Sequence, residues 1–509
     1  MQNKNYFRLT FLLIILAELL SFIGFYFQAV NFFVFFAIVI AALILSLYQL
    51  EYGLWILLVE LFIGSFGYLF YFEHGGFKIS IRQALWLIIL SVWSAKTLLN
   101  LIKNKKLNIK FFESGYFKYF IILFIFIVWG LINGLLNHNQ ASNIFQDFDR
   151  WLYFILIFPI YSVIQTSASV KKLTLIFFAA ITWLSVKTLI LLYIFSHNFN
   201  GFVLDAYHWV RSSGVGEITQ VQGGFSRVFI QSQIFILIGL FVLLFYFFEQ
   251  LNNNQLIQNK KRLYTLYFAL STLYFSTILI SFSRSFWVGL AAGMIFLWCI
   301  FIFKYKIKFN KFVVFNLYIL ASVILSFMLS LIVVFFPLPA AYGGFNPADL
   351  FSERATEITG EAGASSRWQL LPPLWQKIKT APLLGRGFGA TVTYISNDPR
   401  VRANNPTGED TTYAFEWGWL DVWLKLGLIG LLLYLSLFAK LIFNGLKINS
   451  SWSLSLASGL IVLAAVNMFS PYVNHLLGIG YIILTAAITD CLMNKPPSRL
   501  VIKKLKVNI

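Results

Sequence analysis

The chain alternates between long apolar runs and short polar segments. A helix needs about 20 mostly apolar residues to cross the hydrocarbon core of a bilayer. About fourteen runs approach this length, near residues 9–29, 31–48, 53–71, 84–102, 117–136, 151–165, 173–195, 229–248, 264–281, 285–303, 312–336, 419–439, 454–470 and 475–492. This pattern predicts an all-α integral membrane protein, a bundle of about 12–14 transmembrane helices with a long, partly helical extracytoplasmic loop.

Composition supports the same class of protein. Hydrophobic residues make up 59% and charged residues 12% of the 509 positions, and the mean hydropathy is +0.77. Soluble domains are nearer to about 45–50% apolar and about 25% charged. A soluble protein is therefore excluded.

Positive charge is concentrated on one side of the predicted bundle. If the N-terminus is cytoplasmic, the inside segments with their boundary residues hold 24 Lys or Arg and 4 Asp or Glu, whereas the rest of the chain holds 15 and 16. This asymmetry follows the positive-inside rule and predicts cytoplasmic N- and C-termini. It also explains the net charge of +19 without a nucleic-acid partner, since no basic patch is interleaved with stacking aromatic residues.

Two predicted outer segments, 196–227 and 337–417, are too long for simple turns. In the second we expect short helices at 352–361 and 366–380, the latter interrupted by Pro372-Pro373, and a turn at the sequence GRGFG. The predicted organisation is transmembrane helices in 1–336 and 418–492, an extracytoplasmic subdomain at 337–417 and a basic cytoplasmic tail at 493–509.

Familiar motifs of soluble enzymes do not occur. The sequence has no Walker A motif, no C-x-x-C and no H-E-x-x-H, and its glycine-rich GRGFGA lacks the strand and the downstream acid of a nucleotide site. The five histidines are scattered over predicted outer loops and helix ends without the spacing of a metal site. We therefore expect neither a metal nor a cofactor.

The sequence SFSRSFWVGL joins two predicted spans with almost no loop, and it places Arg284 at the outer edge of the membrane. An arginine near hydrocarbon is costly, so it is usually paired or functional. Arg284 either extends toward lipid phosphates or a loop carboxylate, or directs its guanidinium fork at a substrate phosphate.

This sequence resembles the S-x-S-R signature of the O-antigen ligase/polymerase superfamily, whose members transfer glycans linked to a polyprenyl diphosphate. SSRWQLLPPLWQKIKTAPLLGRGFG (365–389) is similar to the family's R-x-x-x-W…P-L-L-G-x-G-x-G stretch, with Leu371 in place of the tryptophan. WGWLDVWLKLGLIGLLLY (417–434) resembles the helix that follows the family's outer loop. The three motifs occur in the family's order and cover about 282–434.

The resemblance implies roles for particular residues. Arg227, Arg284 and Arg367 would bind the diphosphate; the alternatives are an interfacial anchor for Arg227 and, for Arg367, a salt bridge to Glu353, Glu357 or Glu361. Many members have a catalytic histidine before the last helix, and the matching position here is Glu416. Glu416 would be the general base, unless it only complements the helix dipole.

Four further residues are secondary candidates: Ser281, Ser283, Tyr413 and Trp417. The serines flank the signature arginine, and the two aromatic residues flank Glu416, where they would either stack on sugar or belong to the interfacial belt.

Three charged residues fall within predicted spans: Glu18, Glu60 and Lys187. They either mark an ion path or, for Glu60 and Lys187, face the bundle interior or extend to the interface.

The resemblance implies a metal-independent, inverting glycosyltransferase in a bacterial cytoplasmic (inner) membrane. Its donor would be a glycan on a carrier such as undecaprenyl diphosphate, and its acceptor a glycan, lipid or protein hydroxyl or amine. The alternative is a secondary transporter of a small anion, with Arg284 as the binding residue. Transporters usually have internal repeats and broken helices, which the sequence does not show.

Overall fold

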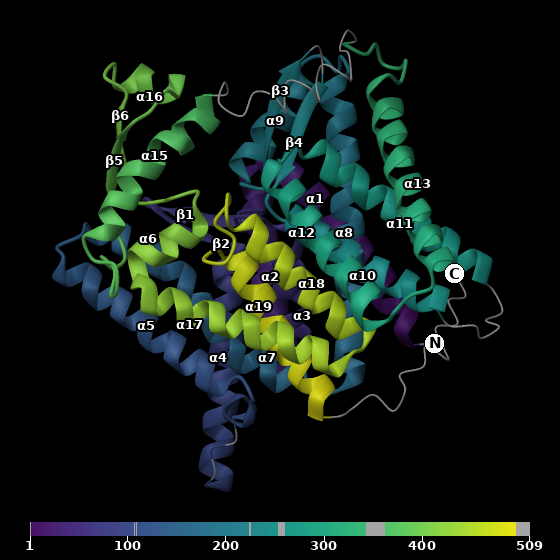
Figure 1. The fold of residues 1–509 in the computed structure, drawn as a ribbon. Coiled ribbons are helices and arrows are strands. Elements are labelled where there is room, and N and C mark those ends of the chain that lie inside the picture. Colours follow the sequence, from purple (N-terminus) through teal and green to yellow (C-terminus); the bar gives the residue numbers. More distant parts are fainter. Residues whose placement is uncertain are drawn as a thin grey trace.

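The computed structural model describes residues 2–105, 107, 109–222, 225–252, 260–342 and 362–494 (Figure 1). Within these residues, eleven helices are long and apolar enough to cross a membrane, which confirms the predicted class. They are α1 (Gln2–Tyr26), α2 (Gln28–Tyr48), α4 (Ile81–Asn104), α5 (Phe117–Leu136), α8 (Ser167–Ser196), α10 (Gln233–Asn252), α11 (Lys260–Ile280), α12 (Arg284–Cys299) with a π-helical extension (Ile300–Lys304), α13 (Phe309–Val334), α17 (Gly418–Ile448) and α19 (Leu476–Asn494).

Three further predicted spans correspond to shorter elements. Residues 53–71 contain α3 (Leu50–Ile63), and residues 454–470 contain α18 (Ser451–Val466). The run at 151–165 lies after α6 (Ala141–Trp151), in a 3-10 turn (Leu152–Leu156) and α7 (Ile157–Val163). α3 ends early because Ser65, with φ of 49°, turns the chain out of the helix toward a β-hairpin.

The bundle has a buried centre and a lipid-facing periphery. Most of the apolar segment of α10 and of α19 is buried (83% and 89%), whereas only 22% is buried in α1, α2 and α13. A helix that is apolar all round belongs in the middle of a bundle, and the sequence of α10, QIFILIGLFVLLFYFF, has this character. On α13, serines recur every fourth residue, and Ser276 of α11 donates to the carbonyl of Ser326 (3.2 Å). Small polar residues of this kind let membrane helices approach closely.

The outer segment at 196–227, expected only as a polar loop, contains regular structure. It forms α9 (Phe202–Ser212) and the hairpin of β3 (Gly216–Gln222) and β4 (Phe225–Ile230), in which Thr219 lies opposite Arg227. A second hairpin pairs β1 (Tyr71–His74) with β2 (Phe77–Ser80). Figure 1 shows α9, β3 and β4 at the same end of the bundle as α15 and α16.

The second outer segment contains α15 (Ala362–Lys379), α16 (Pro399–Asn404) and a hairpin of β5 (Val392–Ile395) and β6 (Glu409–Thr412). The helix expected at 366–380 is confirmed, but the predicted interruption at Pro372-Pro373 is wrong because α15 continues through both prolines. Its apolar side packs into a small core of its own, in which Leu374 is fully buried against residues such as Val392 and Phe415. This packing offsets the hydrogen bonds that the prolines cannot donate. The helix expected at 352–361 lies outside the described residues.

The glycine-rich loop after α15 is a packing element. The amide of Phe388 donates to Gly130 on α5 (2.8 Å), and that of Arg386 donates to Leu424 on α17 (2.6 Å). Gly387 has a φ of 77°, and a Cβ there would lie 2.0 Å from the backbone nitrogen of Gly134. The predicted turn is therefore present, and it lets the loop backbone lie against two membrane helices.

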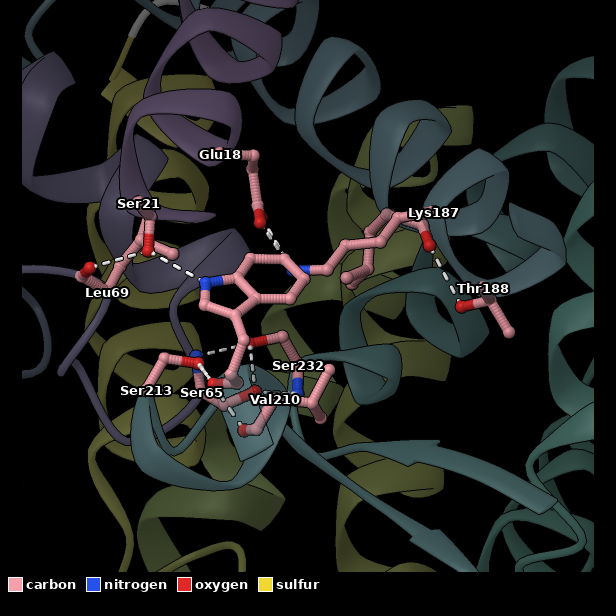
Figure 2. Close-up of polar contacts among 11 residues, drawn as sticks. Glu18, Ser21, Ser65, Leu69, Lys187, Thr188, Val210, Ser213 and Ser232 are labelled. Carbon is pink, nitrogen blue, oxygen red and sulfur yellow. Dashed lines mark hydrogen bonds and ion pairs between the residues drawn. The ribbon is translucent and has the colours of Figure 1, made fainter. Parts of the chain in front are cut away.

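Buried ion pairs connect helices that are distant in sequence. The amine of Lys187 on α8 lies 2.6 Å from a carboxylate oxygen of Glu18 on α1, and the Trp209 ring of α9 covers it at 5.0 Å (Figure 2). Arg82 on α4 pairs with Glu60 on α3 at 2.6 Å. Of the two readings of these intramembrane charges, the structure matches interior pairing, since each has a close opposite charge.

Replacing Gly387 with alanine should destabilise the protein, because alanine combines an unfavourable φ with a backbone clash. We expect a loss of more than about 1 kcal/mol, seen as a lower apparent Tm of the detergent-solubilised protein. Gly201→Ala is the matched control, since a Cβ there has no neighbour within 4 Å. Equal melting of the two variants would contradict the packing role of the loop.

Candidate active site

The S-x-S-R sequence forms the tight link between α11 and α12. α11 ends at Ile280, and α12 begins at Arg284 with Ser283 as its extended N-cap residue. The hydroxyl of Ser281 donates to the carbonyl of Ile278 (2.7 Å) and accepts from the amide of Ser283 (3.3 Å). The link therefore fixes the start of α12, and with it the position of Arg284.

Arg227 contacts this same link from the β3–β4 hairpin. Its Nε donates to the carbonyl of Ser281 at 2.8 Å, and its guanidinium lies 4.9 Å from the centre of the Phe229 ring. Arg227 therefore lies at the N-terminal end of α12, where Arg284 begins the helix 57 positions later in the sequence.

Arg367 joins Glu416 in an ion pair. Arg367 lies on α15, and Glu416 lies just before α17 begins at Gly418. The two side chains remain 49% and 47% exposed, so a ligand can reach them. The indole of Trp417 donates to the carbonyl of Arg367 (3.0 Å), which holds the start of α17 against α15. The alternative partners of Arg367, Glu353, Glu357 and Glu361, lie outside the described residues.

The three arginines share one electrostatic environment. Burial and the positive charges of Arg227 and Arg284 lower the pKa of Arg367 to about 10, against an opposing effect of Glu217. Burial, and then the charge of Arg284, also lowers the pKa of Arg227, again opposed by Glu217. Like charges held this close repel one another, and a bound anion relieves that repulsion. The structure thus holds Arg227 against the link that precedes Arg284 and pairs Arg367 with Glu416, and the charges of Arg227 and Arg284 act on Arg367.

The secondary candidates have structural partners. The Ser283 hydroxyl lies 3.0 Å from that of Ser285, which accepts from Ser470 (3.0 Å), so the serines hold the link to the loop before α19. The Tyr413 hydroxyl donates to the side chain of Gln146 on α6, and the Trp417 ring packs against Trp368 at 5.2 Å. These contacts indicate positioning roles, and stacking on sugar stays a prediction.

Glu217 is a site residue that the sequence analysis missed. It lies on β3 opposite Phe229, two positions from Thr219, which pairs with Arg227. Side chains alternate between the faces of a strand, so Glu217 and Arg227 lie on the same face of the hairpin, while Ile218 and Val228 are buried on the other face. The alternation in GEITQVQGGFSRVFI was a readable hairpin signal.

A buried charge cluster holds α17, the helix that follows Glu416, in place. The amine of Lys425 on α17 lies 2.7 Å from Asp147 on α6 and 2.6 Å from Asp421. Asp147 also accepts from the amide of Gly389 in the glycine-rich loop (2.8 Å). The cluster fixes α17, and so the position of Glu416, against α6 and the loop.

Among the residues that the structure describes, no three His, Cys, Asp or Glu side chains are grouped as a metal site would require. His475 lies near Arg150 and Arg82, and burial, together with these charges, lowers its pKa to about 3. It is therefore neutral at ordinary pH.

Part of the chain matches a known family. A family model described as O-antigen ligase matches residues 268–435, from α11 into α17, a range that contains Arg284, Arg367 and Glu416. Comparison with curated proteins gives no match. The family match confirms the predicted resemblance to the O-antigen ligase/polymerase superfamily, and it supports a glycosyltransferase-like membrane enzyme, a glycan ligase or polymerase.

Proposed function

We propose that this multi-pass protein transfers or polymerises a glycan from a polyprenyl diphosphate, such as undecaprenyl diphosphate, onto an acceptor hydroxyl or amine at the outer face of a bacterial cytoplasmic (inner) membrane. Both termini would be cytoplasmic, and the segment at 337–417 would be an extracytoplasmic subdomain. The observation that carries this proposal is the contact of Arg227 with the Ser281 carbonyl in the link that precedes Arg284, with Arg367 within the electrostatic reach of both arginines.

A diphosphate suits this cluster for reasons of charge and shape. Guanidinium groups present several N–H donors in a plane and bind phosphate oxygens in pairs. Three such groups can contact both phosphates while the polyprenyl chain remains in the membrane beside them. These arginines supply the positive charge, so the proposed reaction requires no metal ion.

In the proposed reaction, Glu416 removes the proton from the acceptor hydroxyl, and the resulting oxygen attacks the anomeric carbon of the donor sugar. The bond between that carbon and the diphosphate oxygen breaks, and the arginines stabilise the charge that develops on the departing diphosphate. A single displacement inverts the anomeric centre.

The ion pair of Glu416 with Arg367 couples this base to the donor. A carboxylate held by a guanidinium is a weak base, because the opposite charge favours its ionised form. A diphosphate that binds Arg367 competes for the guanidinium and so frees Glu416. The base then gains strength only when the donor is in place.

Arg284→Lys should reduce transfer by at least about 100-fold, because lysine keeps the charge but loses the planar fork. Transfer is measured with lipid-linked glycan extracted from a host strain lacking this protein, and with membranes of that strain as acceptor. Arg386→Lys is the control, since Arg386 contacts Thr380 and Asn137. Near-normal transfer by Arg284→Lys and Arg284→Ala would refute the diphosphate role. Solute uptake into liposomes without any lipid-linked donor would favour the transporter instead.

Glu416→Gln should lower turnover by about 10²–10⁴-fold if Glu416 is the base. If Glu416 only complements the dipole of α17, the same change should lower stability by about 0.3–1 kcal/mol and spare turnover. Glu416→His should restore part of the activity with a higher pH threshold, because imidazole titrates at a higher pH than a carboxylate. A Gln variant that keeps more than about a tenth of the rate would identify Glu416 as structural.

A further inference from the structure

A pocket of about 290 Å³ includes Glu217 of β3, the strand that pairs with the strand of Arg227. Its walls come from the turn at residues 64–70, from β2, from the end of α9 and from the start of β3. The side chains that define its chemistry are Phe66, Tyr68, Lys78, Arg211 and Glu217. The volume is near the lower end of about 300–1,000 Å³ for small-molecule sites, which suits one ring-sized ligand.

The lining combines the exposed ring of Phe66 and the half-buried ring of Tyr68 with charged groups. Phe66 is 47% exposed, so it does not serve as a core residue. The Lys78 amine lies 5.3 Å from the centre of the Tyr68 ring, and an Arg211 guanidinium nitrogen lies 3.8 Å from a Glu217 carboxylate oxygen. A sugar ring has an apolar C–H face that packs on aromatic rings, and hydroxyls that hydrogen-bond with charged donors and carboxylates.

Glu217 belongs both to this pocket and to the surroundings of the arginines. On the hairpin, Glu217 lies opposite Phe229, whose ring is 4.9 Å from the guanidinium of Arg227. Its negative charge also acts on both Arg227 and Arg367. A sugar in the pocket would therefore lie beside a diphosphate held by the arginines.

The buried network in Figure 2 holds the pocket walls in place. Ser21 of α1 donates to the carbonyl of Leu69 (2.8 Å) and accepts from the indole of Trp209 (3.2 Å), so it joins the 64–70 turn to α9. The amide of Ser65 donates to the hydroxyl of Ser232 (2.9 Å), which joins the same turn to the chain after β4. These bonds make the pocket a preformed feature, which reduces the entropy cost of binding.

We propose that this pocket is a glycan subsite that holds one sugar of a substrate, with the Glu217 carboxylate accepting hydrogen bonds from its hydroxyls and the Tyr68 ring packing on its apolar face. The inference rests on the proposed transferase function. The sugar belongs either to the lipid-linked donor or to the acceptor. In the first case the affinity for the donor depends on the pocket, and in the second the affinity for the acceptor does.

The test compares Glu217→Gln and Tyr68→Ala with Tyr68→Phe, which keeps the ring, and with Glu409→Gln on the exposed edge of β6 as the control. Three quantities are measured on purified protein: binding of farnesyl diphosphate, which has no sugar; binding of the extracted lipid-linked glycan; and the KM for acceptor membranes. Melting of each variant checks that it is folded.

We expect Glu217→Gln and Tyr68→Ala to weaken farnesyl diphosphate binding by less than about twofold. Each variant should weaken the interaction with one sugar-containing substrate, either the lipid-linked glycan or the acceptor, by about tenfold. A loss of affinity for the lipid-linked glycan assigns the pocket to the donor, and a raised KM for acceptor membranes assigns it to the acceptor. Unchanged values for both, with farnesyl diphosphate binding still dependent on Arg284, would overturn the subsite alone. Absence of farnesyl diphosphate binding to the unmodified protein would overturn the transferase proposal and the subsite together.

Discussion

An isolated charge inside a membrane is costly, and this constraint organises the structure. Several buried charges of the bundle are paired: Lys187 with Glu18, Arg82 with Glu60 and Lys425 with Asp147 across helices, and Lys425 also with Asp421 one turn away on α17. Separating the partners of a buried ion pair leaves each charge buried and unpaired, and losing one partner costs about 3–5 kcal/mol. Each pair therefore favours the one arrangement of its helices that keeps the two charges in contact. The pairs therefore determine which helices are neighbours more specifically than apolar packing between similar helices does.

The arginine cluster is built differently. Arg367 and Glu416 are about half exposed, so a ligand can exchange with the existing contacts. The supporting elements are rigid: the Ser281 carbonyl holds Arg227, and the Lys425 cluster fixes the helix that follows Glu416. The paired buried charges thus serve the fold, whereas the proposed function assigns binding to the more accessible charges. A diphosphate at this depth would keep its polyprenyl chain in the hydrocarbon and its sugar on the outer side, beside the pocket that contains Glu217.

Much of the bundle was predictable because hydropathy is a local property of the sequence. The boundaries of α5, predicted at 117–136, agree with the structure, whereas the spans predicted at 53–71 and 151–165 are shorter helices. The reason is that helix ends here depend on particular residues, such as Ser65 in its left-handed conformation. α15 continues through two prolines because its apolar side packs into a separate core, and the neighbours that form this core were not evident from its own sequence.

The sequence named candidate site residues where they matched a motif, but it did not predict their contacts. The resemblance predicted roles for Arg227, Arg284, Arg367 and, in place of the family's histidine, Glu416, and these roles stay predictions. The pairing of Arg367 with Glu416 was not predicted, since they lie 49 positions apart and three other glutamates were nearer candidates. Glu217 was missed because its position depends on strand pairing, which joins segments that carry no common motif.

The most direct test of the central claim, that Arg227 and Arg284 form one diphosphate site, is a double-mutant cycle on farnesyl diphosphate binding. Arg227→Gln, Arg284→Gln and the double variant are compared with the unmodified protein, with farnesol as the ligand that lacks phosphate. We predict that each single change weakens diphosphate binding but not farnesol binding, and that the two changes are coupled by more than about 0.5 kcal/mol because they share one ligand. Losses that add within about 0.3 kcal/mol, or single variants that bind the diphosphate normally, would contradict a shared site.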